Sequence, residues 1–466
     1  MPTPQHLMTF LGLLVILAPL SLLLLLGVVS LFDRPFSEQT TTRILQVGTA
    51  VGLLAALAVL AGMLILGIRF LPIELGNWVA IPGLYHFSLK FIFDRLSVPF
   101  VILAFVLSGT IGAFSSRYLH RERGFNRFFV LYSLFLLGMV VTALAGTSET
   151  LFTGWEMVGL SSALLVGYYQ SRPGPSRNAL WVWSVYRFSD AALLLAVVVM
   201  HHLGGEGDFD ELLGADVWPY EHAMISSGQA LLIGSLCLAA AAGKSALIPF
   251  SGWLPRAMEG PTPSSAVFYG AVSVHLGVYL LLRLSPLLAC SPVLSVLVVV
   301  LGLSTAFFAY LAGSVQTDIK SALSYASLTQ VGIIVAEIGL WKYIPLYVPL
   351  VHMLGHACLR TSQFLRAPSL LNDYQKLENA IGDHLPQTTT PWRRIANGPA
   401  LSWLYRLGLE RGYFDAALIT WGVRPFVRAA HWCDGLERRW TNLLSGEASR
   451  ESDRVATPFG VIDEIS

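Results

Sequence analysis

Long apolar stretches recur along most of this chain and constrain its fold more than any other feature. A helix needs about 20 predominantly apolar residues to cross the hydrocarbon core of a bilayer. Hydrophobic residues make up 54% of the 466 residues, and charged residues only 13%. We therefore predict an all-α polytopic membrane bundle with about 11 transmembrane helices. The predicted spans centre on residues 8–31, 46–71, 96–116, 127–146, 149–168, 180–201, 228–248, 262–286, 292–313, 321–340 and 345–365.

The stretch GKSALIPFSGWLPRAMEGPTP, residues 243–263, interrupts the seventh of these spans. Lys244 ends the apolar run, and Pro249 follows five residues later. Proline removes a backbone donor and clashes with the preceding turn, and in lipid the freed carbonyl groups need protein or water as partners. We predict a broken seventh helix with Lys244 as a candidate ion or proton site. The alternative interpretation is a lysine that extends to the membrane surface from a helix end.

Basic residues gather in alternate connections between the predicted spans, so one side of the membrane receives most of them. By the positive-inside rule this side is the cytoplasm, which places the amino terminus outside and the carboxyl terminus inside. The basic side holds Arg34, Arg43, Arg117, His120, Arg121, Arg123, Arg127, Arg172, Arg177, Arg256, Lys320 and the carboxyl-terminal tail. The opposite side holds an acidic loop with Glu206, Asp208, Asp210, Glu211, Asp216 and Glu221.

The character of the chain changes after the last predicted span. Residues 1–366 form the predicted bundle, and residues 367–400 are polar and punctuated by proline, as in a cytoplasmic linker. Residues 401–446 place arginines among tryptophans at helical spacing, which predicts amphipathic helices on the inner membrane surface. A helix that docks on a partner is the competing interpretation. Residues 447–466 form a polar tail, and the apolar run at 413–423 is too short to span alone.

Ionisable residues within the predicted spans are the candidate functional groups. Each costs on the order of 2.5 to 3.5 kcal/mol at bilayer depth on insertion scales, so several in one chain indicate function. Glu156, in FTGWEMVGLSS, is either a proton-binding group or a carboxylate that caps a backbone break near Gly154. Arg187 and Asp190 lie three residues apart on one helix face. They form either a structural ion pair or a pair that tunes the neighbouring site.

The later spans carry a second set of candidates. His275 lies in the middle of its span, where a lone histidine is either a proton relay or a satisfied core group. His352, His356 and Arg360 repeat every four residues and so form one polar stripe on a helix. A stripe of this kind needs a wet or protein-lined neighbour. Lys320 opens its span and is either part of the pathway or a surface lysine.

The sequence contains no pattern that predicts a metal or a cofactor. It has no cysteine, histidine and aspartate cluster with zinc-ligand spacing and no phosphate-binding glycine loop. Its four cysteines are too widely spaced for an iron–sulfur centre. We therefore predict no catalytic residue in this chain, no metal and no cofactor, so that any chemistry must reside in a partner.

Four segments resemble those of a known superfamily in order and spacing: GWEMVGLSS, GKSALIPFSGWLPRAMEGPTPSSA, TDIKSALSYASLTQVG and HMLGHACLR. The superfamily is that of the antiporter-like proton-translocating subunits of respiratory complex I and of multisubunit Mrp-type cation/proton antiporters. The resemblance covers roughly residues 80–366. It implies that Glu156 and Lys244 match the family's paired membrane glutamate and broken-helix lysine. It also implies that Arg187 and Asp190 match an arginine and an aspartate on the next helix.

The same resemblance implies that Lys320, His352 and His356 match the family's central polar chain. Two positions depart from the family pattern. Tyr269 stands where the complex I subunits carry a histidine. Arg360 stands where the family usually has a lysine, and an arginine does not release its proton as a lysine can.

The family's later spans, including a second broken helix with its lysine, have no counterpart after Leu365. This difference, together with the segment FLRAPSLLNDYQKLENAIGDHLP, resembles the membrane subunit of two-component inorganic-carbon accumulating complexes of autotrophic bacteria (the DabB family). That resemblance implies a bacterial inner membrane. It also implies a large cytoplasmic zinc-containing partner similar to a β-type carbonic anhydrase (a DabA-like subunit).

We therefore expect a membrane subunit that conducts cations, most simply protons, and energises a partner for accumulation of bicarbonate or carbon dioxide. A proton-pumping subunit of a complex I-like redox complex or of an Mrp-type antiporter is the first alternative. A non-conducting scaffold that holds a partner on the membrane is the second. The polar residues in several separate spans argue against the scaffold, because each is costly to insert.

Overall fold

The chain folds almost entirely into helices, which confirms the predicted fold class. The computed structural model describes residues 4–81, 85–204, 207–214, 217–271, 273–381 and 398–445. The longer helices of the bundle are α1 (Pro4–Leu31), α2 (Glu38–Leu66), α3 (Ser97–Tyr118), α4 (Phe125–Leu144), α5 (Ser148–Val166), α6 (Pro173–Gly204), α8 (Ser227–Lys244), α13 (Pro292–Gly313), α14 (Ile319–Gly339) and α15 (Tyr347–Ile381). The shorter elements are α7 (Phe209–Leu213), η1 (Phe250–Gly252), α9 (Trp253–Arg256), η2 (Ala257–Glu259), α10 (Thr262–Ser265), η3 (Ala266–Ala271), α11 (His275–Arg283), α12 (Ser285–Cys290) and α16 (Pro399–Leu409).

Seven helices in the described part of the chain are long and apolar enough to cross a membrane: α1, α2, α3, α4, α6, α13 and α14. The chain is therefore a multi-pass membrane protein. The other four predicted spans are helical but fall outside this group, because α5, α8 and α15 are more polar and the span at 262–286 is divided among α10, η3 and α11. These four spans carry Glu156, Lys244, His275 and the stripe on α15. The count of eleven stays a prediction.

An antiparallel hairpin, which the sequence analysis did not predict, lies between the second and third spans. It pairs β1 (Leu71–Ile81) with β2 (Tyr85–Phe93), with Leu71 opposite Phe93 and Glu74 opposite Lys90. The register shifts next to Gly76, whose positive φ of 97° favours glycine. The aromatic and branched residues of β2 suit a half-buried strand, and Phe91 and Phe93 are buried. The sequence analysis assigned no span to these residues, because no 20-residue apolar run covers them.

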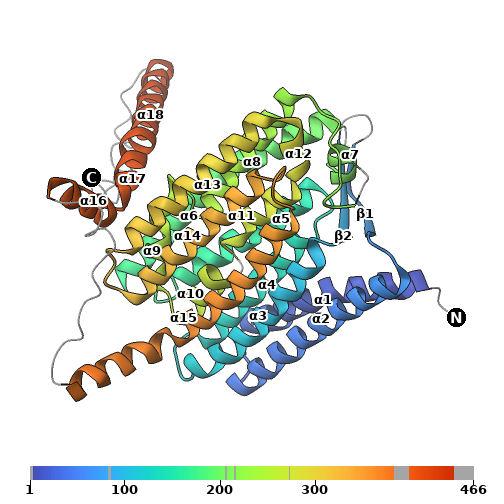
Figure 1. Cartoon of the computed structure of the whole chain (residues 1–466), viewed down its shortest axis with the longest axis horizontal. Coiled ribbons are helices and arrows are strands. Elements are labelled where there is room, and N and C mark those ends of the chain that lie inside the picture. The colour runs from blue at the N-terminus through green and yellow to red at the C-terminus, as the bar shows by residue number, and fades with distance from the viewer. Residues whose placement is uncertain are drawn as a thin grey trace. The chain divides into compact units, whose positions relative to one another are not determined.

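The connections between spans gather at two ends of the bundle, as the alternation of charge predicts. We call the end formed by β1, β2 and α7 the hairpin end (Figure 1). There the Gly146 amide donates to the Lys90 carbonyl at 2.8 Å. At the opposite end, His120 contacts Glu38 at 2.6 Å and Arg127 donates to Gln170 at 2.8 Å. The assignment of these ends to compartments stays a prediction, and Glu206 and Asp216 of the acidic loop lie outside the described residues.

Small residues allow the central helices to approach closely. A side chain at Gly302 of α13 would meet the backbone of α14 at 2.6 Å, and one at Gly332 of α14 would meet α13 at 2.7 Å. Gly154 similarly lies against α4, where a β-carbon would be 2.5 Å from Thr142. Close contact through small residues is the usual way in which membrane helices associate. The Gly154 contact also fixes α5, which carries Glu156.

The end of the chain differs in character from the bundle. α15 continues as one helix to Ile381, beyond the predicted bundle boundary at 366, and α16 packs against α13. A separate compact unit begins at Tyr413 and contains α17 (Phe414–Ala417), η6 (Leu418–Val423) and α18 (Arg424–Ser445). On α18 the exposed apolar residues Phe426, Trp432, Leu436, Trp440 and Leu443 follow helical spacing. The predicted domain boundaries stay predictions, and residues 382–397 and 446–466 lie outside the described part.

A buried ion pair ties the hairpin to the eighth predicted span. Asp94, just after β2, accepts from Arg283 of α11 at 2.5 and 3.3 Å, and both side chains are buried. The same carboxylate caps α3 by accepting the Leu96 and Ser97 amides at 2.9 and 2.7 Å. Arg283 also donates to the Tyr279 hydroxyl at 3.1 Å. One pair therefore links three elements.

We predict that Arg283→Met lowers the free energy of unfolding by about 3–5 kcal/mol, because it leaves a buried carboxylate without its cation. Denaturation of the detergent-solubilised protein, followed by tryptophan fluorescence, measures the change. Arg117→Met, at an exposed position in α3, is the matched control. A loss for Arg283→Met no larger than that of the control would contradict a structural role for the pair.

Candidate functional site

Lys244 lies at the last position of α8 and is fully buried. A capping box of Ser226 and Gln229 begins the helix. The Lys244 ammonium donates to the Trp155 carbonyl of α5 at 3.0 Å and lies over two aromatic rings, 4.9 Å from that of Trp155 and 4.5 Å from that of Tyr186. Its exposed fraction is 0%, so the side chain does not extend to the surface. One carbonyl and two aromatic faces stabilise this cation in the interior.

Arg187 of α6 joins the two carboxylates nearest to this lysine. It forms ion pairs with Glu156 of α5 and with Asp190, the latter at 2.8 Å. Asp190 is buried and also accepts from the Trp155 indole nitrogen at 2.5 Å. The resemblance implied that Glu156 and Lys244 act as a pair, and within the described structure no ion pair joins the two side chains directly. The Glu156 carboxylate pairs with Arg187. Lys244 instead contacts the backbone carbonyl of Trp155, the residue before Glu156.

The four charged residues of this network, Glu156, Arg187, Asp190 and Lys244, become more buried from the edge of the bundle inward. The side chains of Glu156 and Arg187 are 22% and 37% exposed, whereas Asp190 and Lys244 are enclosed. Trp183 lies against Arg187, with the guanidinium 4.1 Å from the ring centre. A charge on the outer pair is therefore accessible from outside the bundle, and a charge on Lys244 is not.

The chain after Lys244 is broken in the way that the proline predicts. Ala246 takes the left-handed conformation, with φ 56°, and short helical turns follow Pro249. The Ser245 hydroxyl donates to the Val274 carbonyl at 2.6 Å, and the Ile248 amide donates to the Thr305 hydroxyl at 3.2 Å. Protein groups thus satisfy the freed backbone, as the bilayer requires. The Ser245–Val274 bond also places the end of α8 beside the start of α11, where His275 lies.

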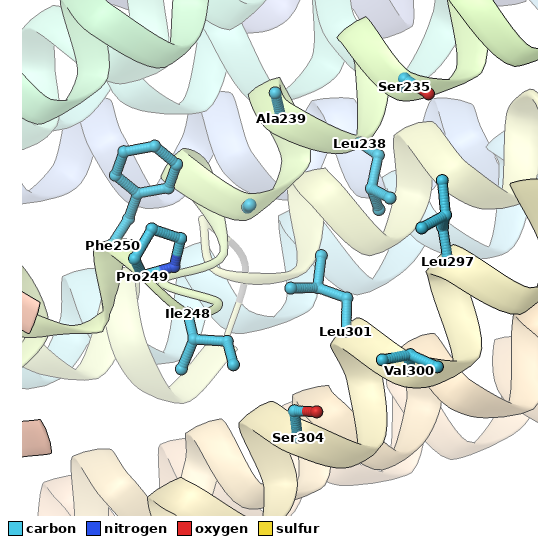
Figure 2. Close-up of a pocket in the computed structure, with 11 residues that line it drawn as sticks. Ser235, Leu238, Ala239, Ile248, Pro249, Phe250, Leu297, Val300, Leu301 and Ser304 are labelled. Carbon is cyan, nitrogen blue, oxygen red and sulfur yellow. The ribbon is translucent and has the colours of Figure 1, made fainter.

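An apolar groove borders this break on its other side, between α8 and α13 (Figure 2). It has a volume of about 410 Å³ and is lined mainly by aliphatic and aromatic side chains. Pro249 and Phe250 lie at the break, with Leu238 on α8 and Leu297 and Leu301 on α13. Because no charged residue lines the groove, it offers no partner for an ion. The charged side chains of the site lie on α5 and α6 and at the end of α8 instead.

A chain of hydrogen bonds joins three of the predicted residues of the later spans. His275 contacts His356 of α15 at 3.0 Å, and the Arg360 Nε donates to the His356 Nε2 at 3.2 Å. Arginine is always a donor, so Nε2 of His356 accepts and its proton lies on Nδ1. His356 then donates to Nε2 of His275. Both rings are buried, and the bonded pair consists of two neutral imidazoles.

His352 lies four residues from His356 but has different partners. It contacts Glu337 of α14 at 3.0 Å and Gln330 at 3.1 Å. Lys320 has no hydrogen bond or ion pair with the other predicted site residues, all of which are described. The predicted stripe is thus divided between two local networks. The side chain of Tyr269, the position that departs from the family pattern, lies outside what the structure describes.

Several residues of the site were missed in the sequence. Trp155 and Tyr186 surround Lys244, and Glu337 holds His352. Trp155 immediately precedes Glu156, which was its only signal, and Glu337 lies in an apolar span as Glu156 does. No group of three or more histidine, cysteine, aspartate or glutamate side chains within the described residues could hold a metal ion. The arrangement is suited to binding and passing protons.

Models of known protein families match most of this chain. Residues 125–384 match the NADH:quinone oxidoreductase/Mrp antiporter membrane family. Residues 78–129 match the amino-terminal region of NADH-ubiquinone oxidoreductase (complex I) chain 5. The two matched regions contain every predicted site residue.

Individual relatives agree with these matches. NADH-ubiquinone oxidoreductase chain 5 of Schizophyllum commune is 34% identical over 66% of this chain and 43% of its own length. The same protein of Petromyzon marinus is 32% identical over 66% of this chain and 50% of its own length. The chain therefore spans about half the length of these curated relatives.

Solved structures share the fold. A chain of the Mrp complex from Dietzia sp. DQ12-45-1b matches with a TM-score of 0.63 at 24% identity, over 88% of this chain and 43% of that one. A chain of the membrane-bound sulfane sulfur reductase, an archaeal respiratory membrane complex, matches with a TM-score of 0.62 at 18% identity, over 85% and 77% of the two chains.

The tautomer of His356 gives a direct test of the arrangement on α15. We predict that Nε2 of His356 is unprotonated in the wild type and that Arg360→Leu, which removes the donor, gives a mixture of the two tautomers. A charge-assisted hydrogen bond of this kind is worth about 1.5–3 kcal/mol, enough to hold one tautomer. Solid-state nitrogen NMR of histidine-labelled protein, assigned by His356→Asn, measures it. An unchanged spectrum in Arg360→Leu would show that Arg360 does not set the tautomer.

Proposed function

Since this chain belongs to the NADH:quinone oxidoreductase/Mrp antiporter family of membrane subunits, we propose that it is a proton-translocating subunit of a multi-subunit membrane complex. The observation that carries the proposal is the enclosed lysine at a broken helix, with two carboxylates and an arginine close by. Its named relatives are subunits of NADH-ubiquinone oxidoreductase. These relatives therefore favour proton translocation in a redox or antiporter complex over a role in inorganic-carbon accumulation.

The charge of Lys244 is the proposed switch. Burial disfavours the ammonium, while Asp190, Glu156 and the aromatic rings favour it. Arg187 determines how much of the carboxylate charge remains free to act on Lys244, because it pairs with both carboxylates. Opening of the Arg187–Glu156 contact would shift this balance, so that Lys244 gains or loses a proton. No group needs to move far for such a change.

The histidines offer the next acceptors. His275 follows the backbone that the Ser245–Val274 hydrogen bond holds beside Lys244. His275 and His356 are neutral in the observed arrangement, so one of them can accept a proton if the other releases one. Arg360 acts as a fixed charge that orients His356 and limits how long a proton stays on it. His352, with Glu337, and Lys320 extend this pathway in the proposal.

A partner at the outer pair follows from its exposure. Glu156 and Arg187 lie at the edge of the bundle, within predicted spans, and charges that face lipid are costly. We propose that another subunit or a water-filled interface covers them. The basic end of the bundle then faces the cytoplasm, with the amino terminus outside, in a bacterial inner membrane.

Inorganic-carbon accumulation is the second candidate. It rests on the segment FLRAPSLLNDYQKLENAIGDHLP, whose last part lies outside the described residues. In this candidate the proton gradient across the membrane energises inorganic-carbon accumulation by a large cytoplasmic zinc-containing, carbonic-anhydrase-like partner. The named relatives favour the redox or antiporter complex instead. The two candidates share the same proton pathway and differ in the partner.

We predict that Glu156→Gln and Lys244→Ala each abolish proton transport while the protein still inserts and assembles. Lys244→Ala removes the group that changes charge in this proposal, and Glu156→Gln removes the carboxylate whose pairing with Arg187 controls that change. Proton uptake by vesicles that contain the intact complex, purified through a tag on this chain, measures the effect. Lys342→Ala, at the surface between α14 and α15, is the matched control. Wild-type transport in either variant would show that the substituted residue does not belong to the proton site.

The composition of the purified complex separates the two candidates. We predict that respiratory or antiporter subunits co-purify with the tagged full chain. Deletion of residues 401–466 should weaken their retention if the exposed tryptophans and arginines of α18 dock on a partner. If instead α18 lies on lipid, deletion leaves the complex intact and lowers binding to vesicles. Recovery of one large zinc protein, without respiratory or antiporter subunits, would replace the first candidate with inorganic-carbon accumulation.

A further inference from the structure

A second contact between ionisable side chains joins α5 and α6, at the hairpin end and apart from the groups described above. His201 in the last turn of α6 contacts Glu149 in the first turn of α5 at 3.1 Å. Their side chains are only 7% and 19% exposed. Phe87 of β2 lies against the imidazole, with ring centres 5.4 Å apart. Gly207, three residues beyond the end of α6, lies against the Glu149 carboxylate, and a β-carbon there would clash with it.

The helix periodicity places this pair in line with the central network. Glu149 and Glu156 are seven residues apart on α5, which puts them on the same face and about 10.5 Å apart along the axis. His201 and Asp190 are eleven residues apart on α6 and also share a face. Because α5 and α6 pack together, both pairs lie along one interface. Of the two threonines between these glutamates, Thr150 and Thr153, only Thr153 has the three- and four-residue spacing that places it on their face.

The hairpin end also holds a separate group of charged side chains. Lys90 of β2 forms ion pairs with Asp208 and Asp210 of the α7 segment, both at 2.8 Å. Burial alone would lower the pKa of Lys90, but its hydrogen bonds to the two aspartates raise that pKa to about 12. Lys90 thus keeps its charge at every physiological pH. His202, the next residue of α6, is exposed.

We propose that Glu149 and His201 form a proton-binding site at the hairpin-end mouth of the pathway. The ligand is a proton that passes between bulk water and the Glu156–Arg187–Asp190 network along the α5–α6 interface. The chemistry is a transfer alone: the imidazole or carboxylate takes a proton on one side and releases it on the other. This proposal rests on the proposed function, because it assigns the pair to that pathway.

The test uses vesicles containing the complex purified through the full chain. His201→Gln and Glu149→Gln keep a hydrogen-bonding side chain but remove the group that binds a proton. Positioned acids and bases contribute at least about 100-fold to proton transfer, so we expect each variant to lower the initial rate at least 10-fold. The double variant should be no slower than the slower single variant, because the two residues act as a unit. His202→Gln is the matched control.

The pH profile separates a proton-binding role from a structural one. A free histidine changes charge between about pH 5 and 8, so a rate that depends on it varies across that range. We expect His201→Gln to flatten the profile and His202→Gln to leave it as in the wild type. A profile and a rate for His201→Gln equal to those of His202→Gln would overturn the proposal.

Lys244→Ala, measured in parallel, distinguishes failure of the hairpin-end proposal from failure of the proposed function. If Lys244→Ala loses transport while His201→Gln keeps the rate and pH profile of the wild type, only the proposal of a hairpin-end site is wrong. Intact transport in Lys244→Ala overturns the proposed function, and the assignment of Glu149 and His201 to its pathway falls with it.

Discussion

The cost of enclosing one ammonium group determines much of this structure. A charge at bilayer depth is expensive, and Lys244 has no exposed surface at all. Its position therefore depends on a carbonyl of α5, on the rings of Trp155 and Tyr186, and on the carboxylate of Asp190 nearby. These groups belong to α5 and α6, whereas Lys244 itself belongs to α8. The close contact at Gly154 and the break after α8 are conditions for the arrangement, because they bring those helices to the lysine.

The other ionisable groups of the bundle divide into pairs that join elements and networks that belong to the proposed pathway. Asp94 with Arg283, and Lys90 with its two aspartates, join elements at the hairpin end and keep their charges. Glu156, Asp190 and the histidines belong to networks in which a small change of partner alters the charge balance. An arginine lies at the centre of each network: Arg187 between two carboxylates and Arg360 beside His356. A cation that does not release its proton can direct protons without storing them.

The sequence was informative wherever one helix carries the signal. Lys244, Glu156, the Arg187–Asp190 spacing and the stripe on α15 were all found from residues within single spans, and the structure places most of them in networks. The contacts of these groups could not be predicted, because the partner of a charged side chain is set by packing between helices: Glu156 pairs with Arg187, and Lys244 contacts the Trp155 carbonyl. The same limit explains why Glu337 was missed as the partner of His352. The hairpin was missed because its strands are too short to resemble a span.

Helix periodicity nevertheless recovers more than single motifs do, once it is known which helices touch. Glu149 and His201 carried no signal alone, since each lies in a terminal turn of its helix. Their spacing from Glu156 and Asp190 becomes meaningful only because α5 and α6 pack against each other. The apolar groove on the far side of the helix break carries no charged group, so it contributes nothing to such a series. In the proposed pathway, the interface of α5 and α6 would therefore lead a proton from Glu149 and His201 at the hairpin end toward Lys244.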